Sequence, residues 1–442
     1  MKLDMTRGKP MRLLLLFALP LMLSSLLQQF YTLCDSMIVG RLLGTEAFAA
    51  TGSASYLHWF ALSMLLGLTG GFGVALSQRF GAKDEEGFRR FFANAAALAL
   101  GVGLLLTAVG VGMLKPLLRM INTPAELFDY TYRYMRTLWS GLIVTASLNL
   151  LTSALRAMGD SRTPFISLVV STVINIVLDY ALIAWIGMGV EGAALATVLS
   201  QIAAAAWCLR GVKRSGLMPE RQHFHLHKPA VHELLRLGIP PLLANGVIAT
   251  GELAVLAAIN RFGVVFVTGN TASRRYFSLF NIAGNALDAA LLTYVGQNWG
   301  AKQKERIRRG TRTAVGMGAV SSTVLSVLII LFARALILLF LPDGTAEALQ
   351  VGVDSLRVEV LFLISLYMLL LHRSAIHGMG NAIIPMCSGF LELVMRVLSA
   401  WLLPLWFGRE GLYFVDAVTW TVTAAMLIVS YHILKRKYLK TE

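Results

Sequence analysis

The sequence is poor in charged residues and in cysteine, and these shortages exclude several classes of protein. Asp, Glu, Lys and Arg make up 14% of the 442 residues. A soluble domain has about 25%, so this chain could not cover a water-exposed surface. Its three cysteines, Cys34, Cys208 and Cys387, lie in apolar runs, which excludes a disulfide scaffold and a thiolate zinc cluster. Regular alternation of apolar and polar residues is also missing, which excludes a transmembrane β-barrel.

Apolar residues, in contrast, are abundant and continuous. They make up 56% of the chain, and the mean hydropathy is +0.67. Because a helix needs about 20 apolar residues to cross a membrane, these runs predict an all-α membrane protein with twelve transmembrane helices. The predicted spans lie near 11–40, 47–78, 91–114, 125–155, 163–186, 190–212, 231–261, 275–299, 310–341, 351–372, 383–408 and 411–434.

The formal net charge of +15 comes from 39 Lys and Arg against 24 Asp and Glu. Most of the cations fall in short gaps between apolar runs rather than in one patch, so we expect no nucleic-acid partner. The positive-inside rule places the basic gaps and both termini in the cytoplasm. We therefore expect a multi-pass protein of the cell (inner) membrane, and we expect it to be a monomer.

The two halves of the chain repeat each other at an offset of about 220 residues. Each half has six predicted spans, so both insert with the same orientation. This predicts two six-helix bundles related by a pseudo-two-fold along the membrane normal, with a binding site between them. The lobes are predicted at 1–212 and 231–442. Matching pairs include 78–83 with 297–302, 158–159 with 379–380, and Pro164 with Pro385.

A polar linker over 213–230 separates the two predicted lobes. It contains three alternating histidines, His223, His225 and His227. A metal site is one reading of this pattern, but no carboxylate or cysteine lies close to the histidines in sequence. We interpret the segment as a solvated cytoplasmic loop.

Two carboxylates in the first lobe lie at the same predicted depth. Asp35 and Asp179 each precede the outer end of a span by seven residues, about 10 Å at the helical rise. Asn175 lies one turn before Asp179 on the same face, and Thr197 lies seven residues into the next span. We expect these four side chains to converge.

Such a set of oxygens suits a sodium ion or a shared proton, because two close carboxylates cannot both stay ionised without a partner. The alternative is a hydrogen-bonded cluster that only holds the helices together. The second half has no copy of this set: at the repeat offset, Asp35 corresponds to Val255 and Asp179 to Ser399. The predicted cation site is therefore confined to the first lobe.

A substrate surface is predicted beside these carboxylates. Gln28 and Tyr31 share a helical face with Asp35, and Tyr134 comes from the fourth span. Aromatic faces can hold organic cations, although ordinary packing explains these residues equally well. Pro20 interrupts the first span, either as a hinge or as a static kink.

Other acidic residues interrupt the spans of the second half. Glu392 lies four residues before Arg396, so we expect the two to pair on one helical face. Glu359 and Asp416 lie near span ends, where we expect them to reach interfacial water. Asp288 has no evident partner in its own span.

The order of several short motifs along the chain resembles that of the multidrug and toxic compound extrusion (MATE) family. The resemblance covers nearly the whole chain and implies cation-coupled export of amphipathic, often cationic compounds from a cleft between two lobes. The motifs are Pro20, Tyr31 and Asp35 in the first span, Gly-Ala-Lys at 81–83, Arg-Ala-Met-Gly-Asp at 156–160, and Asn175 with Asp179.

The resemblance also implies roles for individual residues. Tyr31 and Tyr134 match aromatic positions near the family's site in the N-terminal lobe, and Pro20 matches its bending proline. Glu252 resembles the seventh-span glutamate of another branch and is a secondary coupling candidate, although the tenth-span carboxylate of that branch is missing from 365–372. The positions that match the cation site are Asp35, Asn175, Asp179, Ala193 (through its carbonyl) and Thr197.

We therefore predict an antiporter that uses H⁺ or Na⁺, needs no cofactor and exports small molecules. One rival is a lipid-linked oligosaccharide flippase of the same superfamily. A membrane-embedded enzyme is the other, but His232 and Glu233 lack the second histidine of a zinc protease helix. A glycine pattern at 187–192 lacks the preceding strand of a dinucleotide site.

Overall fold

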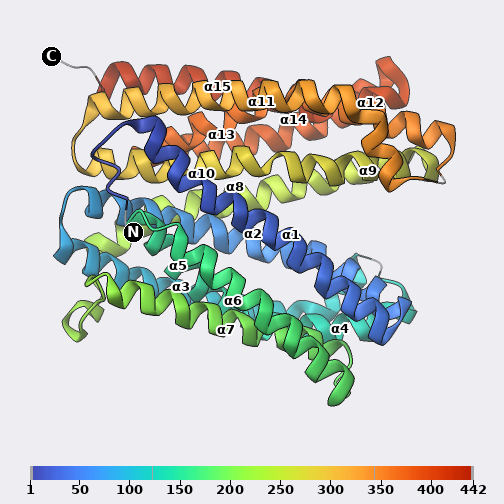
Figure 1. Cartoon of the computed structure of the whole chain (residues 1–442), viewed down its shortest axis with the longest axis horizontal. Helices are drawn as coiled ribbons and strands as arrows, with labels where there is room; N and C mark the ends of the chain where they lie inside the picture. Colours follow the sequence, from blue (N-terminus) through green and yellow to red (C-terminus); the bar gives the residue numbers. More distant parts are fainter. Residues whose placement is uncertain (1–2, 122, 343, 440–442) are drawn as a thin grey trace. The chain divides into compact units, whose positions relative to one another are not determined.

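The computed structural model describes residues 3–121, 123–342 and 344–439, and these residues form helices joined by short turns (Figure 1). No strand occurs among them. Hydrocarbon offers no partner to backbone N–H and C=O groups, and an α-helix satisfies those groups internally. The prediction of an all-α membrane protein is therefore confirmed.

The first half of the chain holds seven α-helices and one π-helix. The π-helix, η1 (Tyr180–Trp185), continues α6 without a break. The α-helices are α1 (Pro10–Leu43), α2 (Thr45–Gly81), α3 (Glu85–Met120), α4 (Ala125–Ser140), α5 (Leu142–Ala157), α6 (Arg162–Asp179) and α7 (Val190–Arg214).

The second half follows the same plan. Two 3₁₀ helices, η2 (Arg221–Phe224) and η3 (Gly408–Phe414), lie in connecting segments. The α-helices are α8 (Lys228–Asn260), α9 (Gly263–Phe280), α10 (Ile282–Gly300), α11 (Lys304–Phe340), α12 (Ala346–Leu361), α13 (Leu363–Gly378), α14 (Ile383–Phe407) and α15 (Val415–Tyr438).

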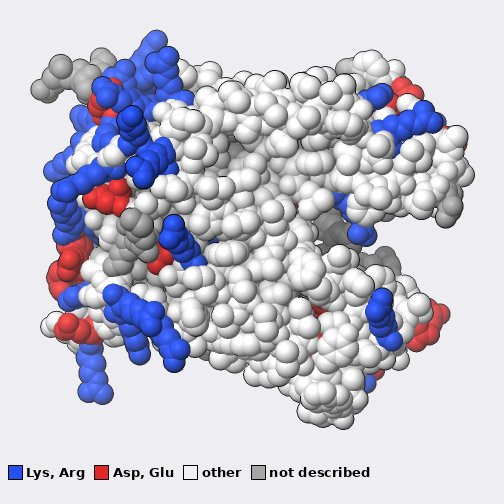
Figure 2. Space-filling view, in the orientation of Figure 1, with Lys and Arg blue, Asp and Glu red and all other residues white. Residues whose placement is uncertain are grey.

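The twelve predicted spans can each be assigned to a helix or a helix pair. Within the described residues, eight helical stretches are long and apolar enough to cross a membrane, and the pair α4–α5, bent by 47°, makes a ninth. One of the eight, Ile383–Tyr438, contains both α14 and α15. The two remaining predicted spans correspond to the helix pairs α9–α10 and α12–α13, whose members are each separated by a single residue. On the face that Figure 2 shows, the charged residues gather near the helix ends and the surface between them is nearly free of charge, as a lipid-facing surface requires.

One predicted boundary is wrong. The span predicted at 275–299 starts too late, because α9 already begins at Gly263. Arg274 and Arg275 interrupt the apolar run there, and charged residues are costly inside a membrane. Arg274 is tolerated within the helix because its guanidinium donates to Asp416 Oδ2 at 3.2 Å.

The helices pack into two compact units, and the division between the units passes through α1 and α8. Unit 1 contains Leu23–Leu242 and residues 3–4, and unit 2 contains Met5–Met22 and residues 243–439. In α1 the division follows Pro20, and in α8 it follows Pro240 and Pro241. Proline removes one helical hydrogen bond. Both helices therefore pass from one unit to the other close to a point where their backbone hydrogen bonding is interrupted. The predicted lobes with a linker at 213–230 stay a prediction.

The linker histidines were expected in a solvated loop, and for His223 this is wrong. His223 is 2% exposed, and its Nε2 lies 3.0 Å from Glu86 Oε2 on α3. Asn94 of α3 accepts from His227 N–H at 3.0 Å and donates to His225 O at 3.4 Å. Polar contacts therefore fix the linker on α3. No group of three His, Cys, Asp or Glu in the described chain could hold a metal ion.

Two glycines of α2 let the first half of α8 approach closely within unit 1. A Cβ atom built on Gly71 would lie 2.1 Å from the Leu237 carbonyl oxygen, and one on Gly67 would lie 2.6 Å from that of Pro241. The two glycines are four residues apart and so face the same side of α2, as in small-xxx-small helix contacts of membrane proteins.

Gly71→Ala is therefore expected to destabilise the protein. The added methyl group meets backbone rather than a flexible side chain, and overpacking of this kind costs roughly 1–3 kcal/mol. Gly70→Ala is the matched control, because a Cβ there meets nothing within 4 Å. Thermal unfolding of the purified protein should show a lower midpoint for Gly71→Ala alone. Equal midpoints for the two variants would contradict this packing.

Candidate cation site in unit 1

The two carboxylates predicted to converge do meet inside unit 1. Asp35 is a half-buried residue of α1, and Asp179 is the fully buried last residue of α6. Each carboxyl group lies close enough to the other to interact electrostatically. The backbone changes from α-helix to π-helix at Tyr180, immediately after Asp179. Such single π turns are frequent at functional sites.

Most oxygens of the carboxyl pair have no hydrogen-bond partner among the described residues. Asp35 Oδ1 and both oxygens of Asp179 have no hydrogen-bond partner in the described part of the chain. Asn175, fully buried one turn earlier on α6, has both its amide oxygen and nitrogen unpartnered there as well. An ionised carboxylate can only accept hydrogen bonds, so two facing carboxylates repel unless a proton or a cation lies between them.

Tyrosine and threonine side chains border the pair. Tyr31 donates its hydroxyl proton to Thr197 Oγ1 at 3.3 Å, and Thr197 donates to the Ala193 carbonyl at 3.2 Å. Tyr134 is buried and close enough to interact electrostatically with Asp35, Asp179 and Tyr31. The structure thus brings these residues together around one site, and the hydroxyls of Tyr31 and Thr197 donate to Thr197 Oγ1 and the Ala193 carbonyl rather than to the carboxylates.

Three other predicted residues do not join this group. The Gln28 side chain is exposed and makes no hydrogen bond in the described part of the chain, although its carbonyl accepts from Thr32. Glu252 belongs to unit 2, where it is exposed on α8. Pro20 lies in the part of α1 that belongs to unit 2, next to the division between the units.

Unit 2 holds a buried ionic network that the sequence only partly indicates. Arg396 of α14 is 5% exposed, and its Nε donates to Asp416 Oδ1 at 3.1 Å. The predicted pair of Arg396 with Glu392 is present at 4.0 Å, but Glu392 also pairs with Arg373 of α13. Arg274 completes the network by its bond to Asp416.

The expectation that Glu359 and Asp416 reach interfacial water is wrong. Glu359 is 5% exposed and accepts from Ser273 at 3.1 Å, and the Asp416 side chain is held by two arginines. Asp288, which had no evident partner in its own span, accepts from Ser374 of α13. The partners come from other helices, so no spacing along one span could have indicated them.

The carboxylates of the two units therefore differ in whether they have hydrogen-bond or ion-pair partners. In unit 2, each of Asp288, Glu359, Glu392 and Asp416 has a hydroxyl or guanidinium partner. In unit 1, the Asp35–Asp179 pair has no such partner among the described residues. Buried polar groups are normally satisfied, so this unsatisfied cluster is a candidate binding site.

Comparison with known proteins finds one family over both halves of the chain. A family model described as MatE matches residues 20–181 and again residues 240–402, which agrees with the repeat offset of about 220 residues. The chain is 28% identical over 422 residues to the probable multidrug resistance protein YpnP of Bacillus subtilis (strain 168), with 92% of each chain covered. It is also 25% identical over 338 residues to an FAD transporter of Shewanella oneidensis, with 75% of each covered.

Solved structures agree with this result at the level of the fold. The chain matches the outward-facing conformation of a multidrug resistance MATE family transporter of the MOP superfamily with a TM-score of 0.92. The sequence identity is 23%, and the match covers 99% of this chain and 98% of the other.

Proposed function

Because the chain belongs to the MatE family of multidrug and toxic compound extrusion transporters, we propose that it exports small molecules by cation-coupled antiport. Membership in this family makes the chain a multi-pass membrane transporter and not an enzyme. The coupling ion is H⁺ or Na⁺. The Asp35–Asp179 pair in unit 1, three of whose carboxyl oxygens have no hydrogen-bond partner among the described residues, is the single observation that supports coupling most strongly.

The proposed mechanism follows from the charge of this pair. With a proton or Na⁺ between them, Asp35 and Asp179 hold α1 and α6 together. Without it, the carboxylates repel, and α1 is free to move relative to α6. Asn175 and the carbonyl of Ala193 would add oxygen ligands, and Thr197 would add its hydroxyl oxygen. Loss of the cation therefore changes the preferred position of the outer half of α1.

Substrate binding would compete with the cation. Tyr31 and Tyr134 border the carboxyl pair and offer aromatic faces, which attract organic cations. A cationic substrate near Asp35 would stabilise the ionised pair and so favour release of the coupling ion. Moving one charge through 100 mV yields about 2.3 kcal/mol, enough for roughly a fiftyfold substrate gradient. One bound ion per cycle is thus sufficient for concentrative export.

The proposed setting is the cell (inner) membrane, with both termini in the cytoplasm. The basic gaps of the sequence support this orientation through the positive-inside rule. All residues of the proposed cation site come from one unit of a single chain, so a monomer suffices for coupling.

Export of ethidium from proteoliposomes under an imposed pH or sodium gradient tests the proposal. We expect export to exceed the zero-gradient rate under one of the two inward cation gradients, which identifies the coupling ion. An export rate that is the same with and without either gradient would overturn cation coupling. Transfer of a lipid-linked oligosaccharide, or of an anion such as FAD, in place of ethidium would overturn the assignment of cationic amphipathic substrates.

A further inference from the structure

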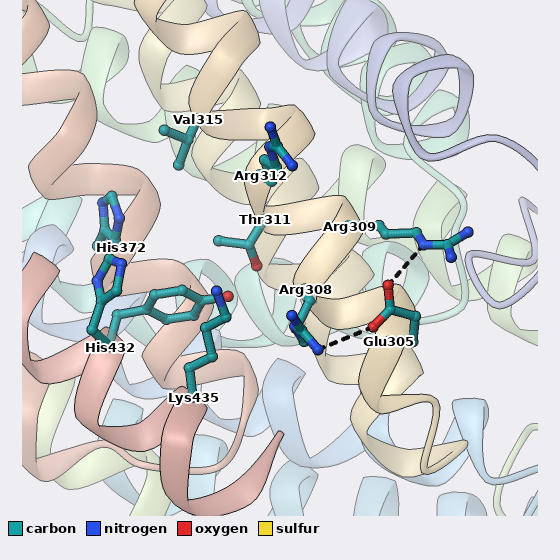
Figure 3. A pocket seen from close by; sticks show the side chains of 10 residues that line it. Glu305, Arg308, Arg309, Thr311, Arg312, Val315, His372, His432 and Lys435 are labelled. Atoms are coloured by element: carbon teal, nitrogen blue, oxygen red, sulfur yellow. Dashed lines mark hydrogen bonds and ion pairs between the residues drawn. The ribbon is translucent and has the colours of Figure 1, made fainter. Parts of the chain in front are cut away.

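A basic cavity lies among α11, α13 and α15 within unit 2, and it shares no residue with the proposed cation site of unit 1. Its volume is about 330 Å³, which lies in the range of small-ligand pockets. Figure 3 shows Arg308 and Arg309 paired with Glu305 on α11, and His372 and His432 next to one another on the facing helices. The lining residues are Glu305, Arg308, Arg309, Thr311, Arg312, Val315, His372, Tyr431, His432 and Lys435.

The charges of this cavity do not balance. Glu305 is its one carboxylate, and it pairs with Arg309 at 2.9 Å and with Arg308 at 3.4 Å. Arg312 and Lys435 make no ion pair in the described part of the chain. Arg312 and Lys435 are therefore left without a counter-charge beside a membrane-spanning segment. An anion bound in the cavity would offset the repulsion among its four basic residues.

Neutral polar groups of the cavity indicate a ligand with hydroxyl groups as well. His372 and His432 each use Nδ1 toward the carbonyl one turn back, at 2.7 and 2.8 Å, which leaves Nε2 for a ligand. In this tautomer Nε2 is an acceptor. Thr311 is 2% exposed, and its Oγ1 approaches the Tyr431 hydroxyl without completing a hydrogen bond to it.

The surface next to the cavity is apolar. Along α11, the face that carries Arg312 continues as the exposed residues Gly316, Val320 and Val324. Along α15, Val429 lies one turn before His432 and is 58% exposed. A ligand whose phosphate is bound in the cavity could thus lay hydrocarbon chains along the apolar surface of both helices. A free phosphate has no hydrocarbon to bind there.

We propose that this cavity binds the head group of an anionic phospholipid, with the phosphate on Arg312 and Lys435 and a head-group hydroxyl on the histidines. Phosphatidylglycerol has this chemistry, since it carries one phosphate and a glycerol with free hydroxyls. Basic pockets between transmembrane helices on the cytoplasmic side are suited to such lipids. A lipid held there joins α11 to α15 at their basic ends.

The test compares lipid retention by two double variants of the purified full-length protein. Arg312→Gln with Lys435→Gln removes the two unpaired cations of the cavity. Arg436→Gln with Lys437→Gln removes the same charge from exposed positions of α15 that do not line the cavity. Native mass spectrometry in neutral detergent counts bound phosphatidylglycerol or phosphatidylcholine, and thermal unfolding confirms that each variant is folded.

We expect the wild-type protein and the Arg436/Lys437 variant to retain phosphatidylglycerol in preference to phosphatidylcholine. The Arg312/Lys435 variant should bind phosphatidylglycerol about 25-fold more weakly, from the loss of two interfacial charges. Equal losses in both variants would overturn the cavity as the site. If inorganic phosphate displaced phosphatidylglycerol at equal concentration, the lipid would be overturned as the ligand, because its acyl chains would then add no affinity.

Discussion

Asp35→Asn is expected to abolish cation-driven export while the protein still folds and inserts. The amide keeps the size of the carboxyl group but carries no charge, so the pair with Asp179 no longer changes between repelling and cation-bound states. Export of ethidium from proteoliposomes should fall to the rate measured without a gradient. The roughly fiftyfold gradient that one charge could support at 100 mV should not form.

The same variant separates coupling from a purely structural role. As an amide, residue 35 can donate a hydrogen bond to Asp179, whose oxygens have no donor in the described structure. Asp35→Asn should therefore raise the thermal midpoint while export is lost, a trade-off typical of functional sites. If the cluster only held the helices together, the midpoint would fall instead.

Asp288→Asn is the matched control for this experiment. Asp288 is also a carboxylate inside a predicted span, but it accepts a hydrogen bond from Ser374, which an amide oxygen can still accept. We expect this variant to keep gradient-driven export. Loss of export in both variants would contradict a specific role for the Asp35–Asp179 pair.

Arg396→Met is expected to produce the largest loss of stability in unit 2. Arg396 is 5% exposed and lies between Asp416 and Glu392, so its removal leaves buried carboxylates with fewer partners. Breaking a buried ion pair from one side costs about 3–5 kcal/mol. Thermal or denaturant unfolding of the purified protein should show a large decrease for this variant.

An exposed arginine–glutamate pair in the same unit provides the comparison. Arg409 contacts Glu347 at 2.6 Å, and both side chains are exposed. Arg409→Met should change the free energy of unfolding by less than about 1 kcal/mol, since exposed ion pairs contribute little. Similar losses for the two variants would contradict the importance assigned to burial of Arg396.

Helical periodicity and depth predict that Asp35, Asn175, Asp179 and Thr197 converge, whereas Ala193 is added only by the family resemblance. Asp35 and Asp179 lie at equal distances from the outer ends of their spans. Both ends lie at the same surface of the bilayer, so the two residues lie at the same depth. Asn175 follows from the one-turn spacing on α6. The approach of the two carboxyl groups also requires that the second half of α1 belong to the same unit as α6.

The features that the sequence did not predict all depend on contacts between distant segments. Glu359 and Asp416 were placed near water because their partners, Ser273 and the arginines of α9 and α14, lie on other helices. His223 was placed in a solvated loop because Glu86 lies 137 residues away. Pairing across helices depends on rotation and tilt, which the hydrophobic pattern does not specify.

The repeat explains why the site occurs in one unit only. The positions that correspond to Asp35 and Asp179 in the second half are Val255 and Ser399, which are buried at 1% and 5% exposure. The second unit keeps its helices but has no carboxylate at either position. Its residues Asp288, Glu359, Glu392 and Asp416 are instead paired with arginines or hydroxyls, an arrangement that stabilises packing.

Release of a cation on substrate binding tests the central claim most directly. In weakly buffered detergent solution, the account predicts that ethidium binding to the wild-type protein releases about one proton or one Na⁺ per chain, because binding linkage is reciprocal. The Asp35→Asn variant should release neither. Ethidium binding to the wild-type protein without release of either ion would contradict the account.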